Sequence, residues 1–220
     1  MQNNPMSWLK VTEDLLSPDL ERLLAQPKVA MDTETLWLDP RRDPLCLVQV
    51  ADAQGAVNIV RARDWHQTTN LKTLLVSPVA KVFHNALFDC SILLANVGVE
   101  VINPYCTRIA SKLARTYGTS HGLSTIVPEL LGIELPKNMQ VSYWSGDLTE
   151  AQLQYAARDV SHLLEIKRQL EAKMQRRPPL STGISMTDLN LRCQAMIPTL
   201  VQLKVNGWQI EGEAATFFGH

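Results

Sequence analysis

Residues 28–38, KVAMDTETLWL, are the stretch that decides the fold. The apolar residues 29–31 run directly into Asp32 and Glu34, and apolar residues resume at Leu36. A short apolar run without alternation predicts a strand that is buried on both faces. Because side chains alternate along a strand, the two acids would project from one face. Two carboxylates placed there repel each other and lose hydration unless a cation lies between them.

A second interpretation of this stretch ends the strand at Met31. Asp32 and Glu34 are then solvated residues of a turn. Pairs of acids occur by chance in many sequences, so this stretch alone does not separate the two interpretations. The rest of the chain has to decide between them.

Composition limits the class of protein. The chain has 220 residues, of which 45% are hydrophobic and 20% charged, and its net charge is -1. This is an ordinary globular composition for one large domain, or for one domain with an appendage. Without an overall basic charge, nucleic-acid binding has to depend on a local site.

The sequence also predicts a cytoplasmic protein that does not bind membranes. No apolar run approaches the roughly 20 residues of a membrane span, and the first residues contain no apolar signal core. The four cysteines are scattered without a C-x-x-C pair, so we expect them to be reduced and buried.

The order of elements predicts an α/β fold with a mixed sheet flanked by helices. Three short strands separated by turns form an antiparallel meander, and further parallel strands alternate with helices. The expected strands are 28–35, 45–52, 56–60, 81–84 and 100–102. The expected helices fall within 7–26, 66–76, 86–97, 111–115, 122–132 and 149–176.

The C-terminal part predicts a separate extension. Residues 1–177 would form the main domain, and residues 178–187 are rich in proline, glycine and serine, as a linker is. Residues 188–220 would add an amphipathic helix, a turn at Asn206-Gly207 and a further strand from residue 208.

Further acidic and phenolic residues follow the first pair. Asp89 ends the segment HNALFD near the start of a predicted helix, and Tyr155 and Asp159 lie four residues apart on one face of another. Each has an ordinary alternative. Asp89 suits the positive end of a helix dipole, Asp159 could pair with Arg158, and Tyr155 could be a core aromatic.

Taken in order, these motifs resemble the DEDD exonuclease superfamily in its tyrosine subclass. This group includes ribonuclease D and the proofreading domain of family A DNA polymerases. The motifs are MDTETLWLD (31–39), HNALFD (84–89) and LTEAQLQYAARD (148–159), and the likeness covers roughly residues 7–176. Each motif is weak alone, but their order and spacing are specific together. The resemblance implies a ribonuclease H-like fold and a 3′-5′ exonuclease.

The resemblance also implies a two-metal site. Two divalent ions about 3.5–4 Å apart activate water and stabilise charge on the phosphate. Hard ions such as Mg²⁺ or Mn²⁺ prefer oxygen ligands, which suits a cluster without histidine or cysteine. The implied metal ligands are Asp32, Glu34, Asp89 and Asp159. Asp32 would bridge the ions, and Tyr155 would orient the attacking water with help from Glu34.

Four further residues match positions that contact substrate in the family. Leu38 would wedge against the terminal base, and Asn85 would contact the terminal nucleotide. Thr33 and His84 complete this set. A histidine at position 84 is closer to ribonuclease D than to the polymerases, which usually have glutamine there.

The C-terminal tail favours a DNA enzyme. CQAMIPTLVQLKVNGWQIE (193–211) resembles the start of the polymerase region of family A enzymes. We therefore expect proofreading of single-stranded DNA 3′ ends, with a polymerase region in cis or in trans as a partner. One alternative is a ribonuclease D-like enzyme acting on RNA 3′ ends. The other is a nucleic-acid-binding domain without activity.

Overall fold

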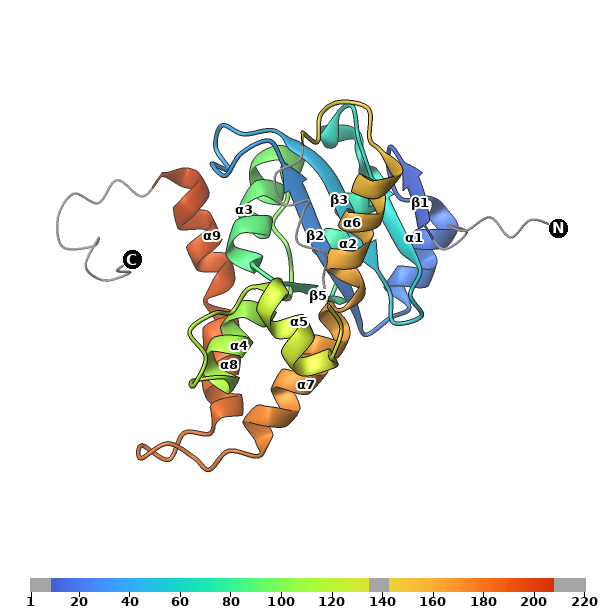
Figure 1. The fold of residues 1–220 in the computed structure, drawn as a ribbon. Helices are drawn as coiled ribbons and strands as arrows, with labels where there is room; N and C mark the ends of the chain where they lie inside the picture. Colours follow the sequence, from blue (N-terminus) through green and yellow to red (C-terminus); the bar gives the residue numbers. More distant parts are fainter. Residues whose placement is uncertain (1–8, 135–142, 208–220) are drawn as a thin grey trace.

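A six-stranded mixed sheet lies at the centre of the computed structural model, which describes residues 9–134 and 143–207 (Figure 1). The strands are β1 (Leu9–Thr12), β2 (Lys28–Thr35), β3 (Leu45–Ala51), β4 (Val57–Val60), β5 (Ala80–Phe83) and β6 (Pro104–Cys106). Their order in the sheet is β1-β4-β3-β2-β5-β6. The pairs β2–β3 and β3–β4 are antiparallel, and the other three neighbouring pairs are parallel. The predicted mixed sheet with an antiparallel meander is confirmed.

Helices cover both faces of this sheet. They are α1 (Ser17–Leu24), η1 (Trp65–Gln67), α2 (Thr69–Val76), α3 (Ala86–Val97), α4 (Thr107–Ala114), α5 (Leu123–Leu131), α6 (Glu150–Ser161), α7 (Leu163–Gln175), α8 (Met186–Ala195) and α9 (Ile197–Asn206). Side chains of α1, α2, α3 and α9 form the core on one face. Side chains of α4 to α8 form the core on the other, where α6 crosses β2 and β3 (Figure 1).

Alternation along β2 determines where its acids point. Val29 and Met31 belong to the core beneath α3, whereas Ala30 belongs to the core beneath α6. Asp32 and Glu34 continue the row of Ala30, so they project toward α6. The strand runs through Thr35 and pairs with β3 along its length, which excludes a strand that ends before the acids.

Two strands differ from the predicted positions. Residues 9–12 form β1 at the sheet edge, where a helical segment was expected, because they pair in parallel with β4. This partner lies about 48 residues along the chain, and local periodicity does not report it. Similarly, β6 lies at 104–106 instead of 100–102.

Two helical regions predicted as continuous are broken. The helix expected over 149–176 divides at His162, where the Ser161 hydroxyl donates to the carbonyl of Ala157 at 2.6 Å. Such side-chain bonding to the preceding turn bends helices. The later helix divides at Met196, directly before Ile197 and Pro198, because proline cannot donate to the preceding turn.

The C-terminal helices α8 and α9 pack on the rest of the fold. The Gln194 amide nitrogen donates to the carbonyl of Cys106 at 3.1 Å, and its oxygen accepts from the Cys106 N–H at 2.7 Å. Ile197 and Val201 of α9 are buried in the core that also contains side chains of α3. Helices α3 and α9 lie side by side (Figure 1). We propose that α8 and α9 belong to the nuclease domain, and the boundary at residue 177 stays a prediction.

Two further predictions were a strand that begins at residue 208 and the absence of a membrane-spanning helix. The strand expected from residue 208 lies outside the described residues. Within the described ranges, no helix has both the length and the apolar character needed to cross a bilayer.

Candidate active site

Three carboxylates converge where β2 meets α6. Asp32 and Glu34 come from the strand, and Asp159 comes from the last turn of the helix. One carboxylate oxygen of each lies within 4.8 Å of the others. The N-terminus of α6 is fixed by a capping box, in which the hydroxyl of Thr149 accepts from the N–H of Gln152 at 3.2 Å. The structure thus brings together residues from two of the three sequence motifs.

Asp89 stands next to these three carboxylates, in the first turn of α3. It is only 2% exposed, and its Oδ1 accepts a hydrogen bond of 2.7 Å from the Thr33 hydroxyl. Its Oδ2 is buried and has no partner among the described residues. Its charge raises the pKa of both Asp32 and Glu34, so it is electrostatically part of the same site. We call Asp32, Glu34, Asp89 and Asp159 the acid site.

Burial raises the pKa of every member of the acid site, and repulsion by neighbouring carboxylates adds to this at Asp32 and Glu34. Burial, followed by the neighbouring carboxylates, raises the pKa of Glu34 to about 9 and that of Asp32 well above its usual value. Burial raises the pKa of Asp89 to about 7 and that of Asp159 to about 6. Two side-chain cations oppose this rise: the charge of Arg158 lowers the pKa of Asp159, and Lys204 interacts with the charge of Asp89.

These carboxylates fit a divalent metal ion. They offer only oxygen ligands, are crowded together and include a buried oxygen without a partner. A hard cation such as Mg²⁺ or Mn²⁺ would compensate their charge and satisfy that oxygen. The geometry supports metal binding by the acid site, and the number of ions stays a prediction.

Tyr155 lies one helical turn before Asp159 and faces the same site. Burial, followed by the charges of Asp159, Glu34 and Asp32, raises the pKa of its phenol, which is therefore protonated at neutral pH. Its ring packs against Trp144 with 6.2 Å between ring centroids. Such a phenol can orient water by hydrogen bonding but cannot serve as a base at neutral pH.

The loop after β2 exposes two apolar side chains beside the acid site. Leu38 is 77% exposed, as a residue that contacts substrate must be, and the neighbouring Trp37 is 63% exposed. Sequence reasoning missed Trp37, although an aromatic residue next to a predicted base contact was a usable signal. Asn85 is also exposed, at the N-cap of α3.

The other two predicted substrate contacts are less accessible. Thr33 is 6% exposed and its hydroxyl is engaged by Asp89. The Nδ1 atom of His84 lies 2.9 Å from the hydroxyl of Thr107. Burial, followed by the charge of Arg108, lowers the pKa of His84 to about 4, so the ring is neutral at pH 7. Substrate contacts by Thr33 and His84 stay predictions.

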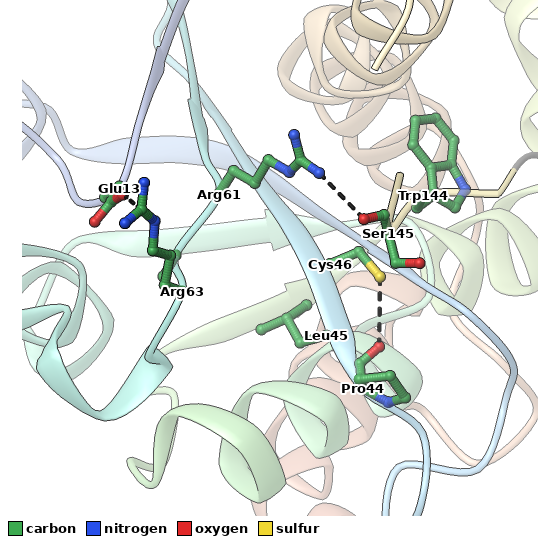
Figure 2. A pocket seen from close by; sticks show the side chains of 9 residues that line it. Glu13, Pro44, Leu45, Cys46, Arg61, Arg63, Trp144 and Ser145 are labelled. Atoms are coloured by element: carbon green, nitrogen blue, oxygen red, sulfur yellow. Dashed lines mark hydrogen bonds and ion pairs between the residues drawn. The ribbon is translucent and has the colours of Figure 1, made fainter. Parts of the chain in front are cut away.

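A pocket of about 480 Å³ lies between the segment before α6 and the end of the sheet where β3 begins and β4 ends (Figure 2). Arg61 points across it and donates to the carbonyls of Ser145 at 3.3 Å and Gly146 at 2.6 Å. Cys46 lines the pocket, and burial, followed by the charge of Glu34, raises the pKa of its thiol. The pocket therefore borders the acid site on the side of Glu34, and Arg61 holds the segment that leads into α6.

The chain matches a family of 3′-5′ exonucleases over residues 10–175. It is 34% identical over 170 residues to ribonuclease D of Gluconacetobacter diazotrophicus, covering 76% of this chain and 43% of the relative. It is 28% identical to DNA polymerase I of Aquifex aeolicus, covering 93% of this chain and 36% of the relative. The chain thus spans less than half the length of these curated relatives.

Solved structures give a match along nearly the whole chain. Brucella melitensis NrnC bound to pGG is 35% identical with a TM-score of 0.82, covering 96% of this chain and 98% of that one. The same protein with bound Mg²⁺ is 34% identical with a TM-score of 0.81, with equal coverage. Escherichia coli RNase D, at 24% identity and a TM-score of 0.69, supports the ribonuclease H-like fold.

These matches favour the ribonuclease alternative over DNA proofreading. The inference from the tail rested on the resemblance of residues 193–211 to the start of a polymerase region. NrnC has no more length than this chain supplies, and α8 and α9 pack on the nuclease core. The match to DNA polymerase I has lower identity than the match to ribonuclease D. The predicted roles in DNA replication and with a polymerase partner are not supported.

Proposed function

Since the chain belongs to the 3′-5′ exonuclease family, we propose that it removes nucleotides from RNA 3′ ends with Mg²⁺ or Mn²⁺ held by the acid site. The convergence of Asp32, Glu34 and Asp159 within 4.8 Å is the observation that carries this proposal. The names of its relatives, ribonuclease D and NrnC, support RNA as the substrate class. A cytoplasmic location stays a prediction.

The acid site and Tyr155 have different roles in hydrolysis. When bound, the divalent ions activate water and stabilise the charge that develops on the scissile phosphate. The acid site holds them, and the protonated Tyr155 orients the attacking water together with Glu34. Attack at phosphorus breaks the bond to the 3′ oxygen of the preceding nucleotide. The products are a nucleoside 5′-monophosphate and an RNA with a new 3′ hydroxyl.

Matched substrates test the choice of RNA over DNA. We expect kcat/KM for a single-stranded RNA, and for pGG, to exceed that for DNA of the same sequence by roughly tenfold or more, about 1.4 kcal/mol. Degradation is followed on labelled strands in Mg²⁺ and in Mn²⁺. Equal or faster degradation of the DNA strand would restore the proofreading interpretation. Cleavage that begins at the 5′ end would refute both.

The exposed apolar pair after β2 gives a further prediction. Replacing Trp37 and Leu38 together with alanine should raise KM for a short RNA by roughly 5- to 100-fold, because base stacking contributes about 1–3 kcal/mol per base. Tyr117→Ala is the matched control, since Tyr117 is also 63% exposed but pairs with Glu129, away from the acid site. An unchanged KM in the double variant would exclude this loop from substrate binding.

A further inference from the structure

Gln49 is a fully buried amide in the middle of β3. Its side chain is 0% exposed, and neither its amide nitrogen nor its oxygen has a hydrogen-bond partner among the described residues. Buried side-chain amides are nearly always paired, so an amide left in this state requires an explanation. One explanation is that the amide belongs to a polar network that holds another side chain in a fixed orientation.

The sheet register places Gln49 beside the acid site. Gln49 lies opposite Asp32 of β2 on one side and opposite Ile59 of β4 on the other. Side chains directly opposite each other in an antiparallel pair project from the same face, with Cβ atoms about 4.5–5.5 Å apart. Gln49 therefore projects toward α6 next to the Asp32 carboxylate, with an apolar neighbour on its other side.

The helix above Gln49 offers no side-chain alternative. The fully buried residues of α6 in this core are Ala156, Ala157 and Val160, and their side chains cannot form hydrogen bonds. The backbone groups of the strand and helix interiors are already used within those elements. The Asp32 carboxylate is a polar group that the register places beside the Gln49 side chain, on the same face of the sheet.

Asp32 in turn lacks a side-chain donor in the part of the chain that the structure describes. The one hydrogen bond that lowers its pKa comes from the backbone of Thr33. A carboxylate that would hold a metal ion has to present its oxygens in a fixed direction. Partners behind the ligands supply that orientation in metal sites, and their removal typically weakens metal binding by about 10- to 100-fold.

We propose that Gln49 is a positioning residue: when metal is bound, its amide N–H, which has no partner in this structure, donates to the Asp32 carboxylate and fixes its orientation toward the metal. This inference rests on the proposed function, because it takes Asp32 as a metal ligand. Gln49 touches neither substrate nor reacting atoms. Its effect is on metal affinity and on kcat, and KM for RNA is unaffected.

Gln49→Met tests this role, because methionine keeps the length of the side chain and removes the amide. Four quantities are measured on the full chain: the melting temperature without metal, Mn²⁺ affinity by calorimetry, and kcat and KM for a short RNA. We expect a melting temperature equal to or above that of the wild type, Mn²⁺ binding weakened roughly 10-fold, and a lower kcat with unchanged KM.

Asn58→Leu is the matched control. Asn58 is a buried amide whose nitrogen is also unpartnered, and it lies opposite Val50, on the face away from α6.

Asp32→Ala in the same titration distinguishes a failure of the Gln49 positioning role from a failure of the metal site. If Asp32→Ala loses Mn²⁺ binding while Gln49→Met binds within about twofold of the wild type, less than the effect expected for such a partner, the positioning role is wrong and the metal site stands. If Asp32→Ala binds like the wild type, the metal site itself is wrong. Weakened binding in Asn58→Leu equal to that in Gln49→Met would also overturn the positioning role. Should Gln49→Met fail to fold, Gln49→Leu is judged by the same measurements.

Discussion

Asp32→Ala is expected to lower kcat for RNA hydrolysis by on the order of 10³-fold or more, since metal ions provide most of the charge stabilisation in such a site. Asp32 sits at the centre of the cluster, and its pKa is raised by burial and then by Asp89, Glu34 and Asp159. Removing it takes away a carboxylate that interacts with all three of the others. Single-turnover rates with saturating Mg²⁺ or Mn²⁺ measure the loss.

The same variant should remain folded. Without metal, its melting temperature is expected to equal or exceed that of the wild type, because a buried repulsive charge is removed. Asp188→Ala is a suitable control, as Asp188 lies in the first turn of α8 and pairs with Ser185. Comparable hydrolysis by Asp32→Ala would refute the site. If the wild type binds RNA but does not cut it in either metal, the chain is a binding domain.

Local sequence predicted the centre of the fold well. The positions of β2, β3, β4 and α3 follow from apolar runs, turn residues and Gly98, which ends α3 with a φ of 81°. The resemblance carried by the three motifs predicted the acids, and spacings of two residues in a strand and four in a helix place Asp32 with Glu34, and Tyr155 with Asp159, on one face. In each of these cases, the signal lies within a few residues of the feature that it predicts.

Features that depend on distant partners could not be obtained in this way. β1 needs β4 as its neighbour, and α8 is held through the contact of Gln194 with Cys106. Gln49 looks like an ordinary polar residue in a strand until the register with Asp32 is known. The same limit explains why the tail favoured a polymerase, because its packing on the nuclease core is not visible in its sequence.

Raising the pH should destabilise the metal-free protein. Asp89, with a pKa of about 7, and Glu34, with a pKa of about 9, hold protons in the folded state. The same groups lose them near about pH 4 when unfolded. The folded state therefore binds more protons, and the free energy of unfolding falls as pH rises through the folded pKa values. This contribution is complete below about pH 4 and declines toward the pKa of Glu34.

The interval from about pH 6.5 to 8 isolates this effect. The pKa of His84 is lowered from 6.5 to about 4, so its opposing contribution adds less than about half a kcal/mol above pH 6.5. The pKa of Lys81 is lowered to about 8, and its opposing contribution stays equally small up to the upper limit. One to two protons at about 1.4 kcal/mol per pH unit give a loss of roughly 2–4 kcal/mol. For a chain of this size, this lowers the melting temperature by roughly 5–10 °C.

Thermal unfolding in a metal chelator at both pH values measures this loss. Glu34→Gln should make the pH dependence shallower by about one proton, since the replacement keeps the shape of the side chain and does not titrate. Saturating Mg²⁺ or Mn²⁺ should reverse the trend, because the ions bind the ionised carboxylates and metal affinity therefore rises with pH. A melting temperature that is constant or rises with pH in the chelator would show that the acids are not crowded in the folded protein. Such a result would remove the electrostatic reason for a metal between β2 and α6.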